Sequence, residues 1–210
     1  MPDTRSEYEG LFSLYVPVAI AVAVLVFGAT FYALARYRRS RPGEPSRRAT
    51  APVLESVYAA GLAVIAAVLI AFTFDATGDI DAGANGRPGA EIDVTAGKWN
   101  WRFDYRGTGV SQVGTDDRAP TLVVPTEVPV RFHLRSIDVI HAFWIPERRF
   151  KRDAIPGRVT TFDLVFDHPG AVTSGTCAEF CGLRHSDMRF TVRCLAPGDF
   201  RGWLRRRSAR

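Results

Sequence analysis

Two long apolar segments near the amino terminus constrain the fold of this chain more than any other feature. They span residues 11–35 and 53–74, and prolines and a glycine at positions 42–45 separate them. Each segment is long enough to cross the roughly 30 Å hydrocarbon core of a membrane as a helix. The sequence therefore predicts that residues 1–75 form a two-helix transmembrane anchor.

Arginines predict how this hairpin is oriented in the plasma membrane. Six of them lie between the apolar segments: Arg36, Arg38, Arg39, Arg41, Arg47 and Arg48. The positive-inside rule places this connection in the cytoplasm, so both termini and everything after Asp75 are expected on the extracytoplasmic side. No basic segment precedes the first span and no small-residue cleavage site follows it. This pattern favours a retained two-pass anchor over a signal peptide.

Glu55 lies one turn inside the second apolar segment. A carboxylate deep in a membrane is costly, although the cost falls near the interface. Two interpretations remain open. The side chain reaches toward the nearby arginines, or it contacts another membrane subunit or a proton path.

The rest of the chain is typical of an all-β domain. Residues 76–90 are rich in Gly and Asx and predict a flexible linker. In residues 91–200, short alternating apolar runs are separated by Gly and Pro at intervals of about ten residues, which is typical of a sandwich or small barrel. No helical periodicity competes there, and residues 201–210 are expected to form a basic tail.

The charge distribution gives no sign of a nucleic-acid partner. The formal net charge is +5, but it comes mostly from arginine clusters between the apolar segments and at the carboxyl terminus. Between residues 75 and 200 acids slightly outnumber bases. A basic groove for phosphates is therefore not expected.

The segment 176–188 concentrates metal-ligating side chains. Cys177, Cys181, His185 and Met188 all lie within it. Thiolate, imidazole and thioether together are the ligand set that selects copper. A blue copper site needs one cysteine, whereas two cysteines four residues apart can both bridge a pair of copper ions. The segment therefore predicts a two-copper electron-transfer site.

Two other readings of this segment remain open. Cys177 and Cys181 would form a disulfide in an extracytoplasmic domain, or the Cys and His residues would bind zinc. Neither reading needs Met188. His141 is the candidate for a further ligand, because the large apolar residues around it would exclude water.

The remaining histidines and the third cysteine are expected to have structural roles or to be exposed. His133 alternates within a predicted strand, and His168 precedes a proline in a turn. Cys194 lies in a further alternating run, which predicts a buried packing thiol.

Four aromatic residues alternate in one predicted strand: Trp99, Trp101, Phe103 and Tyr105. Alternate residues of a strand point to the same face of a sheet, so most of this stripe is expected in the core. Trp99 stands at the start of the strand. We therefore nominate it as the residue through which electrons enter, since tunnelling favours short packed paths.

These residues resemble a known family. His141 followed by Cys177-x-Glu179-x-Cys181-x3-His185-x2-Met188 behind a two-helix anchor resembles subunit II of the haem–copper terminal oxidases, the cytochrome c oxidases. The resemblance covers nearly the whole chain, including the Trp-rich strand and residues 151–158. It implies a cupredoxin Greek-key barrel over residues 91–200 and an electron-relay subunit of an oxidoreductase, in which oxygen is reduced at subunit I.

The resemblance also implies a role for each ligand. Cys177 and Cys181 would bridge both metals of a dinuclear copper centre, CuA. His141 and Met188 would complete one copper, and His185 with the backbone carbonyl of Glu179 would complete the other.

Further positions match the family by the same resemblance. The Glu179 side chain would face a magnesium ion shared with subunit I, and Trp99 would pass electrons to the coppers, from which they reach haem in subunit I. Glu55 falls near the mouth of a proton channel of subunit I. Asp138 and Asp153 match positions that secure the loop and the subunit I contact.

Some positions depart from the family pattern. Tyr58 and Leu62 stand where the second helix usually carries Trp and Pro, and Asn100 replaces an aromatic residue, which concerns helix packing rather than the copper ligands. The usual acidic docking face for cytochrome c is not obvious. The donor is expected to be cytochrome c, a membrane-tethered cytochrome or a small copper protein. The rival functions are a quinol-oxidase subunit that has lost its copper ligands and a membrane-anchored copper chaperone or sensor.

Overall fold

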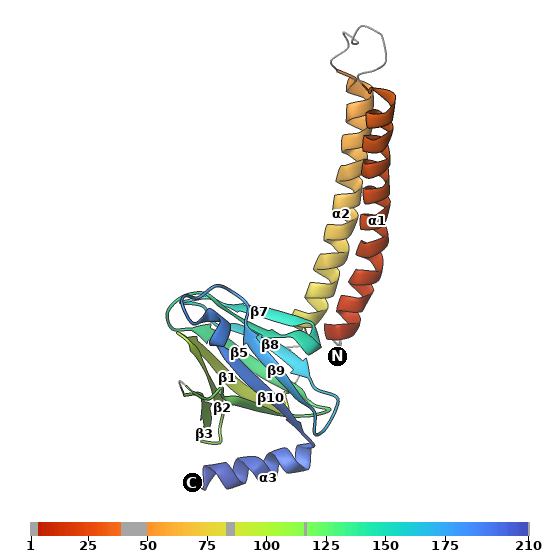
Figure 1. Ribbon diagram of the computed structural model, residues 1–210. Helices are drawn as coiled ribbons and strands as arrows, with labels where there is room; N and C mark the ends of the chain where they lie inside the picture. Colours follow the sequence, from red (N-terminus) through yellow and green to blue (C-terminus); the bar gives the residue numbers. More distant parts are fainter. Residues whose placement is uncertain (1–3, 39–49, 83–86, 116, 210) are drawn as a thin grey trace. The chain divides into compact units, whose positions relative to one another are not determined.

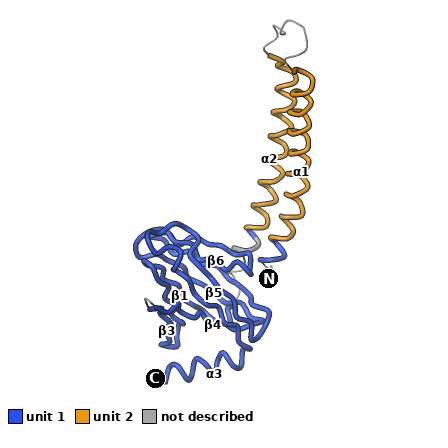
Figure 2. The backbone as a smooth tube through the Cα atoms, viewed as in Figure 1, with its two compact units in different colours: residues 1–7, 78–210 blue, residues 8–77 orange. Residues whose placement is uncertain are grey.

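The chain divides into two compact units. The structure is a computed structural model that describes residues 4–38, 50–82, 87–115 and 117–209, without the side chains of 79–82. One unit comprises residues 8–77, and the other comprises residues 1–7 with 78–210 (Figure 2). The prolines and most of the arginines predicted to connect the two apolar segments lie outside the described residues.

The first unit contains residues 8–36 of helix α1 (Thr4–Arg36) and residues 52–77 of helix α2 (Pro52–Ala82). Both are long and apolar enough to cross a membrane, each with a mean hydropathy of 2.4. The Tyr15 hydroxyl donates a hydrogen bond of 3.0 Å to the Leu69 carbonyl and lies 2.6 Å from the Thr73 hydroxyl, so it joins the two helices. The predicted helical hairpin is confirmed.

Helix α2 continues further than the apolar pattern indicated. It ends at Ala82, inside the segment predicted to be a linker, whose residues 83–86 lie outside the described part of the chain. Near this end the hydroxyls of Thr73 and Thr77 donate to the carbonyls four residues earlier, at Leu69 and Thr73. These bonds give both hydroxyls an acceptor within the helix itself.

The second unit is a sandwich of two sheets (Figure 1). One sheet has the order β3-β2-β1-β5-β8 and the other the order β4-β10-β9-β6-β7. The strands are β1 (Ala90–Gly97), β2 (Asn100–Tyr105), β3 (Val110–Val113), β4 (Thr121–Pro125), β5 (Pro129–Ser136), β6 (His141–Ile145), β7 (Phe150–Ala154), β8 (Thr160–Val165), β9 (Val172–Cys177) and β10 (Arg189–Leu195). Strands β1 and β5 pair in parallel, as do β4 and β10, whereas the other pairs are antiparallel. The predicted all-β domain is confirmed.

Aromatic side chains fill the space between the sheets. Trp101 and Phe103 of β2 each pack edge-on against Phe190 of β10, with ring centroids 5.4 and 5.5 Å apart. Phe143 of β6 stacks on Phe190 at 4.8 Å. All four side chains are fully buried, and each contributes about 1.5–3 kcal/mol of stability by burial. The alternating stripe therefore lies in the core as predicted from Trp101 to Tyr105.

Three elements of the structure were not predicted from the sequence pattern. Strands β3 and β7 lie at the outer edges of their sheets, and too few of their residues are buried to give a clear alternation. A third helix, α3 (Pro197–Ser208), begins with Pro at its first turn and occupies most of the segment expected to be a basic tail. Phe200 is buried, and the Trp203 ring lies 5.1 Å from that of Tyr105. The spacing of these two side chains marks one apolar face of a helix.

Candidate metal centre

Two neighbouring strands and one loop bring the predicted ligands together. His141 opens β6, Cys177 ends β9, and the following loop returns through a short helical turn (His185–Asp187) to β10. Strands β6 and β9 are paired through Phe143 and Cys177. Sheet pairing therefore places a distant imidazole beside the cysteine loop.

The loop is closed by backbone hydrogen bonds. The N–H of Cys177 donates to the Met188 carbonyl over 2.9 Å, and the N–H of Ala178 donates to the Ala142 carbonyl over 3.1 Å. Gly182 adopts φ +116°, which L side chains rarely adopt, and a Cβ there would lie 3.3 Å from Trp99 Nε1. The glycine therefore allows the loop to pass close to this indole.

The two sulfurs of the loop cysteines lie at the centre of the site. Sγ of Cys177 and Sγ of Cys181 are 3.8 Å apart. Nδ1 of His141 lies 3.7 Å from the Cys177 sulfur, and Nδ1 of His185 lies 3.5 Å from the Cys181 sulfur. All three cysteines are free thiols, so the structure does not support the disulfide.

A thioether and a carbonyl complete the donor set. Met188 Sδ lies 3.8 Å from Cys181 Sγ, and the backbone oxygen of Glu179 lies 3.2 Å from Cys177 Sγ. His141, Cys177, Cys181 and Met188 are buried, which limits access of water. Six donor groups, with soft sulfur predominating, exceed the four that a closed zinc site uses and suit copper.

The environment separates the acidities of the two thiols. Burial opposes ionisation of Cys177, but hydrogen bonds from the His141 imidazole and nearby backbone groups outweigh burial and lower its pKa to about 6. Burial and the neighbouring Cys177 charge raise the pKa of Cys181 to about 12. The first thiol therefore ionises readily, whereas a bound cation must displace the proton of the second.

Asp138 orients the His141 ring. Its Oδ1 lies 2.8 Å from His141 Nε2, and its two oxygens also accept the N–H groups of Lys98 and Val139, each over 2.7 Å. Partial burial opposes ionisation, but these hydrogen bonds prevail and lower the pKa of Asp138 to about 2. The carboxylate therefore forms a hydrogen bond with Nε2, and Nδ1 faces the sulfurs.

Two tryptophans hold the same loop. The indole N–H of Trp99 donates to the Cys181 carbonyl over 3.2 Å, and that of Trp101 donates to the Met188 carbonyl over 3.3 Å. Trp99 is half-buried and Trp101 fully buried. The contact of Trp101 with the loop was not predicted from the sequence. The available signal was that a buried indole N–H needs a hydrogen-bond acceptor.

The remaining predicted residues lie around or outside this cluster. The Glu179 carboxylate is partly exposed and lies 3.6 Å from Lys151 Nζ, which is also 3.7 Å from Asp153 Oδ1. Glu55 belongs to the helical unit, in the first turn of α2, where Oε1 accepts the Ala51 N–H over 2.9 Å.

The other candidate ligands take no part in the site. His133 lies 3.3 Å from the Glu91 carboxylate and 3.2 Å from the Thr161 hydroxyl, and His168 is exposed. Cys194 is buried in the core, which raises the pKa of its thiol. The structural roles expected for His133 and Cys194 are confirmed, as is the exposure of His168.

Comparisons with known proteins point in one direction. A family profile described as cytochrome C oxidase subunit II, periplasmic domain, matches residues 102–195. The probable cytochrome c oxidase subunit 2 of Nocardia farcinica is 31% identical over 257 aligned residues, covering 91% of this chain and 68% of that protein. The cytochrome c oxidase subunit 2 of Alkalihalophilus pseudofirmus is 31% identical over 218, covering 99% of this chain and 60% of that protein.

Solved structures agree with these relatives. The crystal structure of the periplasmic domain of subunit II of cytochrome oxidase (CoxB) of Bradyrhizobium japonicum superposes with a TM-score of 0.53 at 26% identity. The match covers 59% of this chain and 96% of that domain. A mixed disulfide intermediate between the thioredoxin-like protein TlpAs and subunit II of cytochrome c oxidase is similar, with a TM-score of 0.51 at 25% identity over 59% of this chain and 94% of that one.

Proposed function

We propose that this chain, which belongs to the cytochrome c oxidase subunit II family, accepts electrons at a dinuclear copper centre held by His141 and the β9–β10 loop. The chain is a two-pass membrane subunit of an oxidoreductase, the haem–copper oxidase, and serves as its electron-accepting subunit. Its outer domain has the cupredoxin-like fold expected from the resemblance. Oxygen itself is reduced elsewhere in the complex.

The observation that carries this proposal is the pair of sulfurs 3.8 Å apart with an imidazole beside each of them. In the proposed site Cys177 and Cys181 would hold both copper ions. His141 and Met188 would supply the further ligands of one, and His185 with the Glu179 carbonyl those of the other. Bound copper supplies a reversible one-electron change.

The surrounding residues hold the ligands in one geometry for both redox states. Asp138 fixes the His141 ring, and the indoles of Trp99 and Trp101 fix two carbonyls of the ligand loop. The aromatic core limits movement of water and protein dipoles when the charge changes. In the proposed path, electrons enter through Trp99, because its indole contacts the peptide of a bridging cysteine.

The finer assignments of orientation and partners belong to the same proposal. Residues 1–75 serve as the anchor, and residues 76–90, which begin with the last residues of α2, connect it to the copper domain of residues 91–200. Residues 201–210, most of which belong to α3, form the basic extension of that domain. The copper domain and both termini lie outside the plasma membrane. Electrons leave for haem in subunit I. The Glu179 carboxylate contributes to a magnesium site shared with that subunit, Asp153 secures the subunit I contact, and Glu55 lies at the mouth of a proton channel.

Assembly requires both loop thiols in reduced form. A thioredoxin-like protein forms a mixed disulfide with a related subunit II, and in this chain the sulfurs of Cys177 and Cys181 lie side by side. We therefore propose that a thioredoxin-like protein reduces the thiols of this chain before copper binds.

Electron paramagnetic resonance of the full chain in detergent, loaded with copper, tests the proposal. Hyperfine structure from two equivalent copper nuclei is expected. A single-copper spectrum would indicate a chaperone or sensor, and retention of zinc in preference to copper would indicate a structural metal. Failure to bind either metal would overturn the proposed electron relay.

A further inference from the structure

A strip of arginines crosses the outer face of the second sheet. Arg189 and Arg193 alternate along β10 with the buried residues Phe190 and Val192, so both point outward. Arg118 lies in the segment before β4, which pairs with β10, and Arg207 lies on α3. Two adjoining cavities of about 390 and 430 Å³ share Arg118 in their walls. We call Arg118, Arg189, Arg193 and Arg207 the basic strip.

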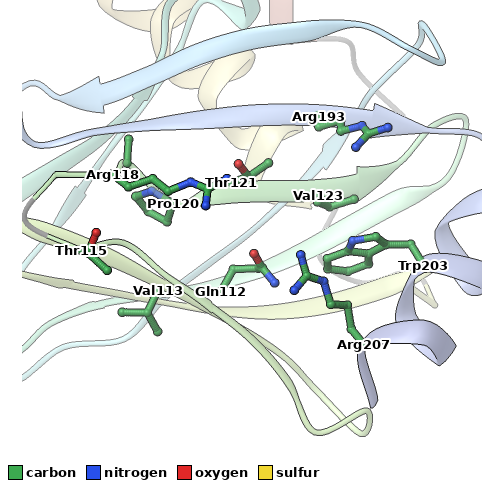
Figure 3. A pocket seen from close by; sticks show the side chains of 11 residues that line it. Gln112, Val113, Thr115, Arg118, Pro120, Thr121, Val123, Arg193, Trp203 and Arg207 are labelled. Atoms are coloured by element: carbon green, nitrogen blue, oxygen red, sulfur yellow. The ribbon is translucent and has the colours of Figure 1, made fainter. Parts of the chain in front are cut away.

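Among the residues that the structure describes, the basic strip is not neutralised by carboxylates. The first cavity is lined by Arg118, Arg193 and Arg207 and by none of the described acidic residues, and these arginines surround it from three sides (Figure 3). Within the described part of the chain, no carboxylate forms an ion pair with any of the three. Guanidinium groups in this state favour carboxylates and phosphates, which they bind with two parallel hydrogen bonds.

The same strip reaches the residue through which electrons are proposed to enter. Trp99 lines the second cavity together with Arg118, Arg189, Lys98 and Arg184. Two acids, Asp117 and Asp187, also line it, and Asp187 is already 3.8 Å from Arg184. Among the described residues, cations therefore outnumber acids around the half-buried Trp99, and the lining of the first cavity adds further cations and no acid.

We propose that the electron donor is a protein with an acidic face, which docks on the basic strip and places its redox centre over Trp99. This inference rests on the proposed function and specifies its partner. In the productive complex the reduced donor loses one electron, the copper centre gains it, and no bond forms or breaks. Complementary charge would raise the association rate by about 10- to 1000-fold at low ionic strength.

One donor protein in two charge states tests the docking. The full chain, loaded with copper in detergent, is mixed in a stopped-flow apparatus with reduced mitochondrial cytochrome c, which is basic, or with the same cytochrome after succinylation of its lysines, which is acidic. We expect the succinylated form to reduce the copper faster by about tenfold or more at low salt, with a rate that falls as salt is added.

Variants locate the effect on the strip. Arg118→Glu and Arg193→Glu together are expected to slow reduction by succinylated cytochrome c about tenfold, without changing the copper spectrum. Arg135→Glu is the matched control, because Arg135 is exposed on β5 in the other sheet, and it should change the rate less than about twofold.

Several outcomes would overturn the inference. Faster reduction by unmodified cytochrome c would show that the chain does not recognise an acidic donor face. Equal rates with the two forms of cytochrome c, independent of salt concentration, would show the same. Calorimetry with pyrophosphate tests whether the basic strip binds small anions instead. Tight binding that the double variant loses, with both reduction rates unchanged, would show that the basic strip is a small-anion site. Absence of the two-copper spectrum would instead mean that the proposed function itself has failed.

Discussion

Oδ1 of Asp138 lies 2.8 Å from Nε2 of His141, and the other ring nitrogen faces the sulfur of Cys177. The carboxylate therefore orients the imidazole, with its other nitrogen directed at the proposed copper site. Asp138→Asn removes the charge but keeps the shape, and we expect copper affinity to fall about 10- to 100-fold. Competition with a copper chelator measures this change. Asp153→Asn serves as the control, and equal affinities for both variants would remove Asp138 from its orienting role.

Met188→Leu is expected to retain copper and shift its reduction potential. The thioether is a weak ligand, and the buried site accepts a leucine of similar volume at a cost below about 1.5 kcal/mol. Redox titration followed by the visible spectrum measures the potential. A reduction potential equal to that of the unmodified chain would show that Met188 is not a copper ligand.

Cys181→Ser should abolish the dinuclear centre, since a hydroxyl does not replace a bridging thiolate. The remaining thiol of Cys177, with its lowered pKa of about 6, can still hold one metal ion. Copper quantification should give one ion per chain or none, with a single-copper resonance. Cys194→Ser is the control because that thiol lies outside the ligand set, and two coppers bound to the Cys181 variant would contradict the bridging assignment.

Trp99→Phe should slow reduction of the copper centre and leave the copper spectrum unchanged. The substitution removes the indole edge and its hydrogen bond to the Cys181 carbonyl, but it replaces no donor atom of the proposed copper centre. Stopped-flow reduction by the donor, compared with Trp203→Phe, measures the effect. Unchanged donor kinetics would rule out the proposed path through Trp99.

Alkaline pH should destabilise the β sandwich through Tyr105. Burial raises the pKa of its phenol, and the hydroxyl donates to the Val123 carbonyl and accepts the Val123 N–H. The neutral phenol is thus favoured by folding, so this contribution is complete below the unfolded pKa of about 10 and is lost as pH rises above it. Urea unfolding at pH 8 and at higher pH measures the loss, and Tyr105→Phe should flatten the profile.

The sequence was sufficient to predict a feature wherever that feature depends on a single local pattern. Alternation placed Trp101 and Phe103 in the core, and four ligands fell in one short segment around Cys177 and Cys181. His141 could be nominated because its apolar neighbours exclude water. The structure then brought its ring to the sulfurs through the pairing of β6 with β9.

Features that depend on tertiary neighbours could not be read from the chain. Nothing local shows that Trp101 donates to the Met188 carbonyl. The near-balance of charges between residues 75 and 200 hides the basic strip, because strand pairing and α3 bring Arg118, Arg193 and Arg207 together from separate segments. The edge strands β3 and β7 have too little one-sided burial to alternate clearly.

The separation of His141 from Cys177 by 36 positions along the chain has a consequence for copper binding during folding. A chain whose β6 and β9 have not paired offers a metal only the ligands of the short loop. We therefore expect copper to stabilise the paired strands, because a ligand that binds only the folded state favours that state.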